Sequence, residues 1–286
     1  MGKLTTYLSF IRFSHSVFAL PFALTGALLA WQVAPFAWRQ ILWVIVAMVA
    51  ARSAAMGFNR LVDARMDALN PRTAAREIPT GALRRGEATL FVLVMSLIFM
   101  FAATMLNPLC GVLSPLALII VFWYSLAKRF TSYTQLFLGL AMAVAPVGGW
   151  LAAGGPIGAP EPWLLGLAIG LWVGGFDILY ACQDVEFDRA NGLKSIPVRF
   201  GVPRSLWISR AMHVATIAAM VTLGALTSLG PIYFAGVALV AGLLFYEQSL
   251  VSAHDLSQVK RAFDLNGWVG ILYFVATGIA LYVRQG

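Results

Sequence analysis

The chain has 286 residues, of which 60% are hydrophobic and only 11% are charged. A soluble domain carries roughly 25% charged residues, so this composition excludes an ordinary soluble protein and indicates a chain that spans a membrane. The net charge of +8 does not indicate a nucleic-acid partner, because the basic residues punctuate apolar runs and form no basic stripe.

Apolar runs follow one another along the whole chain, and a helix of about 20 such residues crosses a bilayer. We treat the first run as a retained helix and not as a cleaved signal peptide. The predicted spans are 15–34, 41–59, 88–106, 109–127, 135–153, 162–181, 205–228, 231–250 and 266–283. The sequence therefore predicts an all-α polytopic membrane protein with about nine transmembrane helices and a single domain, residues 1–286.

The basic residues are distributed unevenly between the two sides of this predicted bundle. If the N-terminus is cytoplasmic, eighteen of the twenty Lys and Arg residues fall on the cytoplasmic side, and only Arg39 and Arg284 lie opposite. This asymmetry follows the positive-inside rule. We therefore expect an integral protein of the bacterial inner membrane, with its N-terminus and its cap loops in the cytoplasm.

The acidic residues gather on that same side, where topology does not require them. Of the twelve Asp and Glu residues, only Glu161 falls on the outer side. Two groups lie at the ends of the second and sixth predicted spans and in the loops that follow: Asp63, Asp67, Glu77 and Glu87, and Asp177, Asp184, Glu186 and Asp188. This clustering predicts a functional site at the cytoplasmic ends of these two spans.

The two groups share a four-residue spacing, which places side chains on one face of a helix. The first stripe consists of Arg52, Asn59, Asp63 and Asp67, and the second consists of Asp177, Tyr180, Asp184 and Asp188. The motifs at 59–67 and 180–188 recur four predicted spans apart, and an Ile-Pro pair follows each of them. We therefore predict two related four-helix halves around a central cavity, plus one extra helix.

Facing pairs of carboxylates repel each other strongly unless cations lie between them. Mg²⁺ suits such a site, because it takes oxygen ligands, keeps several waters and bridges carboxylates to substrate phosphates. Basic residues nearby could hold the remaining phosphate charge: Arg72, Arg76, Lys128, Arg129 and Lys194. A diphosphate ester in an apolar bundle indicates an isoprenoid diphosphate as substrate.

Simpler interpretations of the individual residues stay open at this point. Each aspartate pair could be a solvated helix end that a neighbouring arginine neutralises. Arg52 could extend its guanidinium to the interface, Asp177 could be a polar contact within the bundle, and Tyr124 could belong to an interfacial aromatic belt. The recurrence of both pairs with the same spacing on the same side favours a functional site.

The motifs resemble those of the UbiA superfamily of membrane prenyltransferases. Asn59-Arg-Leu-Val-Asp63-Ala-Arg-Met-Asp67 is similar to its first aspartate motif, and Tyr180-Ala-Cys-Gln-Asp184-Val-Glu-Phe-Asp188 is similar to its second. The resemblance extends to 70–81, 124–129 and 194–201. Asp177-x₂-Tyr180 and the opening segment 10–21 are most similar to the 4-hydroxybenzoate polyprenyltransferase branch and its menaquinone-pathway relatives. Many enzymes of that branch have Asn-Asp where this chain has Asn59-Arg60.

The resemblance implies an enzyme that transfers a polyprenyl group from polyprenyl diphosphate to an aromatic acceptor. It implies 4-hydroxybenzoate as the acceptor, a role in ubiquinone or menaquinone biosynthesis, and Mg²⁺ as the cofactor. The implied metal and catalytic residues are Asp63, Asp67, Asp184 and Asp188. The implied diphosphate-binding residues are Asn59, Arg72, Arg76, Lys128, Arg129 and Lys194. Arg52, Tyr124, Asp177 and Tyr180 would contact the acceptor. The prenyl tail would lie against membrane lipid, and no obligate protein partner is expected.

A transporter of an anionic lipid or metabolite is the alternative. It would explain the intramembrane charges and the repeat, but alternating access predicts functional groups that reach both sides of the membrane. The outer loops of this chain are nearly free of charge. The distribution of charge therefore favours the enzyme.

Overall fold

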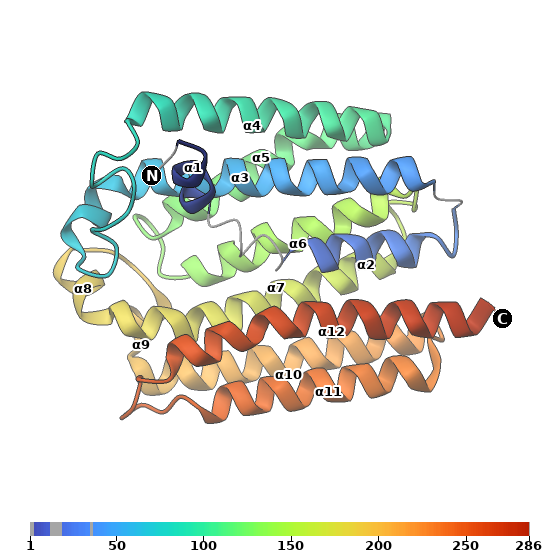
Figure 1. Ribbon diagram of the computed structural model, residues 1–286. Helices are drawn as coiled ribbons and strands as arrows, with labels where there is room; N and C mark the ends of the chain where they lie inside the picture. Colours follow the sequence, from blue (N-terminus) through green and yellow to red (C-terminus); the bar gives the residue numbers. More distant parts are fainter. Residues whose placement is uncertain (1–2, 12–18, 35–36, 286) are drawn as a thin grey trace.

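The computed structural model describes residues 3–11, 19–34 and 37–285, and these residues form helices and connecting loops without a β-strand (Figure 1). The elements are α1 (Lys3–Phe10), α2 (Leu20–Ala30), α3 (Trp38–Leu69), α4 (Arg85–Leu106), α5 (Pro108–Ala127), α6 (Thr134–Ala152), α7 (Pro160–Ala181), a 3₁₀ turn (Cys182–Asp184), α8 (Val185–Ala190), α9 (Ile196–Phe200), α10 (Val202–Leu226), α11 (Gly230–Ser249) and α12 (Val259–Gln285). The long helices lie side by side, with loop 70–84, α8 and α9 together at one end of the bundle (Figure 1).

Eight helices of the described chain are long and apolar enough to cross a membrane, and they match the second to ninth predicted spans. The first prediction, 15–34, corresponds to α2, an apolar helix of 11 residues. Residues 12–18 lie outside the described residues, so part of that span and most of the opening segment 10–21 are not placed. The prediction of an all-helical membrane bundle is confirmed.

The outer surface of the bundle is apolar, as a bilayer requires. Large hydrophobic side chains are exposed along the long helices, among them Leu97 (65% exposed), Val112 (77%) and Phe245 (78%). A soluble monomer rarely exposes apolar surface on this scale. These faces are the ones that lipid covers.

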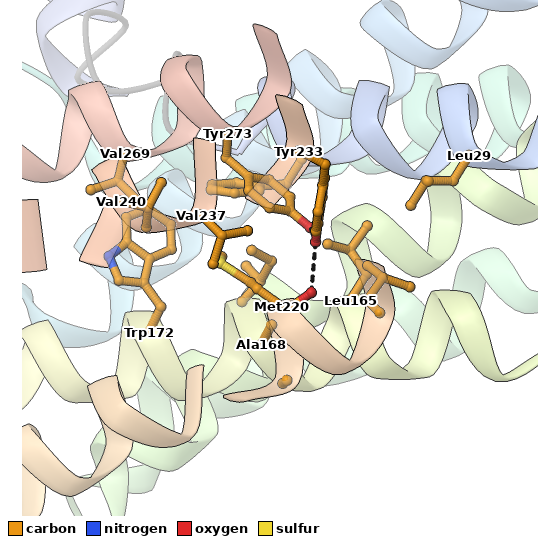
Figure 2. Packing of buried hydrophobic residues seen from close by; sticks show 14 of the residues in the cluster. Leu29, Leu165, Ala168, Trp172, Met220, Tyr233, Val237, Val240, Val269 and Tyr273 are labelled. Atoms are coloured by element: carbon orange, nitrogen blue, oxygen red, sulfur yellow. Dashed lines mark hydrogen bonds between the residues drawn. The ribbon is translucent and has the colours of Figure 1, made fainter. Parts of the chain in front are cut away.

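The core is built mainly from large side chains of α2, α6, α7, α10, α11 and α12. Trp172 lies at its centre, fully buried, and packs its ring against that of Phe22 at a centroid distance of 5.0 Å. The hydroxyl of Tyr233 donates to the carbonyl of Met220 at 2.8 Å, as the dashed line in Figure 2 shows. This core joins α7, which carries the start of the second motif, to α2, α10, α11 and α12.

Helices α2 and α6 approach so closely that glycine is required at their contact. A Cβ at Gly26 would overlap the carbonyl oxygen of Pro146, and a Cβ at Gly149 would overlap that of Ala23. Small residues allow this close approach between membrane helices. The contact fixes α2 against the rest of the bundle even though α2 is short.

The structure confirms one expectation about the acidic motifs and corrects another. Although hydropathy ends the second span near residue 59, α3 continues to Leu69, so Asn59, Asp63 and Asp67 lie on one helix as their spacing predicts. The second stripe does not lie on one continuous helix, because α7 ends at Ala181 and a 3₁₀ turn precedes α8. Such a turn tightens the backbone locally and interrupts the regular α-helical spacing between Asp177 and Asp188.

Candidate functional site

The first aspartate motif lies buried at the end of α3, where it meets basic residues from the end of α5. Asp63 is only 3% exposed, and its Oδ2 lies 2.8 Å from Nζ of Lys128 and accepts a hydrogen bond from Asn59 at 3.2 Å. Arg129 approaches the other carboxylate oxygen at 3.5 Å and donates to the carbonyl of Val62. Asn59 also lies 3.4 Å from the hydroxyl of Ser125. The stripe predicted on α3 is therefore packed against α5.

Loop 70–84 connects this motif to the second one through two arginines. Arg76 donates from Nη1 to both oxygens of Asp67, at 2.7 and 2.8 Å. Arg72 donates from Nε and Nη2 to the two oxygens of Asp184, at 3.1 and 2.5 Å, and from Nη1 to the hydroxyl of Tyr180 at 2.6 Å. One loop thus holds α3 and the end of α7 together over the site.

Arg72 keeps its positive charge in this position. Burial lowers the pKa of its guanidinium, but the hydrogen bond to Asp184 and the charges of Tyr180, Asp184 and Asp67 raise it by more, so the net shift is upward. A planar guanidinium that binds a carboxylate with two parallel bonds can bind a phosphate in the same way.

Asp188 completes the set of four aspartates. Among the described residues it forms no ion pair, but the charges of Asp184, Lys128, Arg72 and Asp63 all act on it. The two motifs therefore share one electrostatic neighbourhood. Within the described part of the chain, Asp63, Asp67 and Asp184 pair with basic residues from other segments.

Lys194 has a different position from the other predicted diphosphate-binding residues. Its ammonium group donates to the carbonyl of Phe130 at 3.3 Å, and its backbone N–H donates to the carbonyl of Lys128 at 2.8 Å. It therefore ties the loop after α8 to the end of α5. In this arrangement its charge lies beside the site and contacts no carboxylate of the described chain.

The residues that we assigned to the acceptor gather below the aspartates. Tyr124 is close enough to Arg52, Asp63 and Asp177 for their charges to act on its hydroxyl. The Nε atom of Arg52 is buried and has no hydrogen-bond partner in the described structure. An unsatisfied guanidinium nitrogen is costly, so a ligand with an acceptor oxygen would be stabilised here.

Three contacts of the site were not predicted from the sequence. Arg60 is buried and pairs with Glu77 at 3.1 Å. Ser125 hydrogen-bonds to the motif asparagine. Phe263, from the distant α12, packs on Tyr180 at a ring-centroid distance of 5.0 Å. No spacing in the sequence indicates that α12 reaches the second motif.

The donor set suits a hard cation. Within the described residues, no three His, Cys, Asp or Glu side chains are close enough to form a ready metal site. Mg²⁺ does not need one, because it binds through one or two carboxylates, substrate phosphate oxygens and water. Asp63 retains a buried Oδ1 without a hydrogen bond, and Asp188 lacks a basic partner, so both can turn toward a cation.

Comparisons with known proteins agree with one another. The model of the UbiA prenyltransferase family matches residues 19–276. A protein named 4-hydroxybenzoate octaprenyltransferase from Tolumonas auensis is 33% identical over 229 residues, which cover 80% of this chain and 79% of that protein. Another of the same name, from Shewanella woodyi, is 30% identical over 235 residues and 82% of each chain.

Solved structures give the same result. A UbiA homolog from Aeropyrum pernix K1, in its apo form, matches with a TM-score of 0.85 and 36% identity over 96% of this chain and 98% of that one. A UbiA homolog from Archaeoglobus fulgidus bound to GPP and Mg²⁺ matches with a TM-score of 0.74 and 20% identity, over 97% and 99%. The second match shows a shared fold.

Proposed function

The chain belongs to the UbiA prenyltransferase family, and from this premise we propose that it transfers a polyprenyl group from polyprenyl diphosphate to 4-hydroxybenzoate with the help of Mg²⁺. The observation that carries the proposal is the pair of aspartate motifs held together by Arg72 and Arg76 of one loop. Arginines that bind carboxylates in this way can exchange these hydrogen bonds for hydrogen bonds to the oxygens of an incoming diphosphate.

The charge of the site supports the need for a metal. Asp63, Asp67, Asp184 and Asp188 carry four negative charges, and Arg72, Arg76, Lys128 and Arg129 carry four positive ones, so the set is neutral. A diphosphate adds negative charge that these residues alone do not balance. The A. fulgidus homolog that shares this fold binds GPP together with Mg²⁺. Bound Mg²⁺ would stabilise the charge that develops on the leaving diphosphate.

The chain's own residues would promote cleavage of the bond between the prenyl carbon and the diphosphate. Arg72, Arg76 and Lys128 would bind the departing oxygens and so stabilise the transition state electrostatically. Tyr180, which already bonds to Arg72, would lie beside the allylic cation, where an aromatic face is favourable. The cation must be kept from water, and loop 70–84 covers this end of the bundle.

The acceptor would bind below the diphosphate, between Arg52 and Tyr124. Arg52 offers an unsatisfied buried N–H to the benzoate carboxylate, and the ring carbon beside the acceptor's hydroxyl would attack the cation. The names of the relatives support 4-hydroxybenzoate as the acceptor. Arg60, where many enzymes of this branch have Asp, pairs with Glu77 of loop 70–84.

The proposed location is the bacterial inner membrane, with the site on the cytoplasmic side and the product entering ubiquinone or menaquinone synthesis. The charge asymmetry of the loops supports this orientation. The first motif is on the last turns of α3, the second runs from the end of α7 into α8, and these elements meet at the end of the bundle that carries loop 70–84 (Figure 1).

The test is prenyl transfer by the purified protein in lipid, with 4-hydroxybenzoate, a polyprenyl diphosphate and Mg²⁺. We expect a prenylated benzoate that is lost with EDTA and with Asp63→Ala. Product from a dihydroxynaphthoate-type acceptor alone would overturn the acceptor and keep the mechanism. Failure to release diphosphate with any acceptor would overturn the proposed reaction and favour transport.

A further inference from the structure

A basic pocket lies on the face of α3 opposite the aspartates. It has a volume of about 380 Å³, within the range of ligand-binding pockets, roughly 300–1,000 Å³. Its walls come from α3, loop 70–84 and the start of α4, and they include Arg65, Arg84 and Arg85. Because Arg65 lies two positions from both Asp63 and Asp67 on one helix, it points away from the site.

The protein neutralises only part of the positive charge of this pocket. Among the described residues, none of the three arginines forms an ion pair. Of the two nearby carboxylates, Glu77 pairs with Arg60 at 3.1 Å, whereas Glu87 lies 3.7 Å from Nζ of Lys3 and accepts from the backbone N–H of Arg84 at 3.0 Å, so its charge offsets part of that of Arg84. Three guanidinium groups with one carboxylate beside them leave a net positive charge that favours an anion, and their planar geometry suits a phosphate.

The pocket continues into an apolar surface. Ile78, Pro79 and Leu83 line it beside the arginines. Below Arg85, a stripe of α4 at four-residue spacing is exposed and apolar, with Leu93, Leu97 and Phe101 each more than half exposed. A molecule that fills both parts needs an anionic head at the membrane boundary and hydrocarbon chains beneath it.

We propose that this pocket binds the phosphodiester headgroup of an anionic membrane phospholipid, whose acyl chains lie along α4. Basic pockets at the membrane boundary recognise such headgroups, and each basic residue near the surface contributes about 1 kcal/mol. Free phosphate would use the arginines but not the apolar stripe. The stripe therefore selects a lipid over a soluble anion.

The bound lipid would also support the site, an effect that rests on the proposed function. Loop 70–84 presents Arg72 and Arg76 to the aspartates on its inner side and forms the pocket wall with Ile78 and Leu83 on its outer side. A lipid held against the outer wall restricts the loop that carries both arginines. Prenyl transfer should therefore be faster in bilayers that contain the anionic lipid.

The test is the retention of phosphatidylglycerol by the intact protein in native mass spectrometry, compared with phosphatidylcholine. The variant Arg65→Gln/Arg84→Gln removes two pocket charges and keeps Arg85, which also contacts the carbonyl of Leu61. At about fivefold in affinity per arginine, we expect phosphatidylglycerol to bind about 25-fold more weakly. The control Arg204→Gln/Lys260→Gln changes two exposed basic residues outside the pocket and should leave binding unchanged.

Several outcomes would overturn the proposal. The first is that the pocket variant and the parent protein retain phosphatidylglycerol equally. The others are that inorganic phosphate displaces the lipid from the pocket, or that a polyprenyl diphosphate replaces it there. If the double variant does not fold, Arg65→Gln alone should still weaken binding about fivefold. Lipid retention is measured without enzymatic turnover. A failure of the proposed prenyl transfer would therefore not overturn the lipid-binding proposal. Stimulation of transfer by phosphatidylglycerol is measured separately.

Discussion

The end of the bundle around Asp63 and the core around Trp172 both bury polar side chains, but they do so in different ways. In the core, the hydrogen bonds join neutral groups: Trp172 donates to Asn266 at 2.7 Å, and Gln248 donates to Ser209 at 2.7 Å, while Oε1 of Gln248 and the carboxylate oxygens of Glu247 have no hydrogen-bond partner among the described residues. At the site, full charges from separate segments are paired. The core bonds join helices, whereas we propose that the charged pairs are exchanged for a ligand.

The largest expected effect is at the buried carboxylate of the first motif. Asp63→Asn keeps the shape and an oxygen for Lys128 but removes the charge, so we expect transfer to fall about 1,000-fold or more. The thermal midpoint in the absence of substrate should change little, because Lys128 is exposed enough to be solvated. The rate of prenyl transfer and the thermal midpoint are both measured in the same lipid. A large loss of stability would mean that Asp63 serves to stabilise the fold, as the hydrogen-bonded pairs of the core do.

The next effect concerns the bridge made by Arg72. Arg72→Lys retains the charge but loses the fork that binds Asp184 and Tyr180 together, so kcat/KM for the prenyl diphosphate should fall about 100-fold. Steady-state kinetics at saturating acceptor would show it. A lysine variant with unchanged kinetics would mean that charge alone suffices there.

A smaller and more selective effect is expected at Arg52. Arg52→Gln removes the proposed partner of the acceptor's carboxylate, so KM for 4-hydroxybenzoate should rise about 10-fold to 100-fold. The KM for the prenyl diphosphate should stay the same. The check is a pair of titrations, one for each substrate. An equal rise in both constants would contradict a role confined to the acceptor.

The smallest effect is expected in the core. Trp172→Phe removes the hydrogen bond to Asn266 and should cost about 1 kcal/mol of stability, the usual scale for a bond between membrane helices. The activity of the folded fraction should be unchanged, which assay at a low temperature would reveal. A drop in activity with no loss of stability would contradict the view that the core around Trp172 stabilises the fold and does not act in the reaction.

The sequence was sufficient for the parts of the molecule that follow local periodicity. Apolar runs predict the spanning helices, and four-residue spacing predicts that Asn59, Asp63 and Asp67 share a face. The partners of these residues could not be predicted, because they depend on the path of loop 70–84 and on how distant helices pack. Neither the bond from Arg72 to Asp184 nor the contact of Phe263 with Tyr180 has a signal in the sequence.

The boundaries of the acidic motifs show the same limit. Hydropathy ends the second span near residue 59, where the chain becomes polar, but α3 continues to Leu69, with Asp63 and Asp67 paired to Lys128 and Arg76. The 3₁₀ turn at Cys182–Asp184 breaks a stripe that the spacing alone would draw as continuous. Hydropathy therefore marks the limit of the apolar run and not the end of the helix.

The balance of four aspartates against four basic residues has a consequence for the order in which ligands assemble. A cation that arrives alone meets carboxylates already engaged by Arg72, Arg76 and Lys128, and must compete with them. A diphosphate that arrives with its counter-ion can draw the arginines away and free the carboxylates in one exchange. Metal affinity measured without the diphosphate should therefore be weak, and each ligand should strengthen the binding of the other.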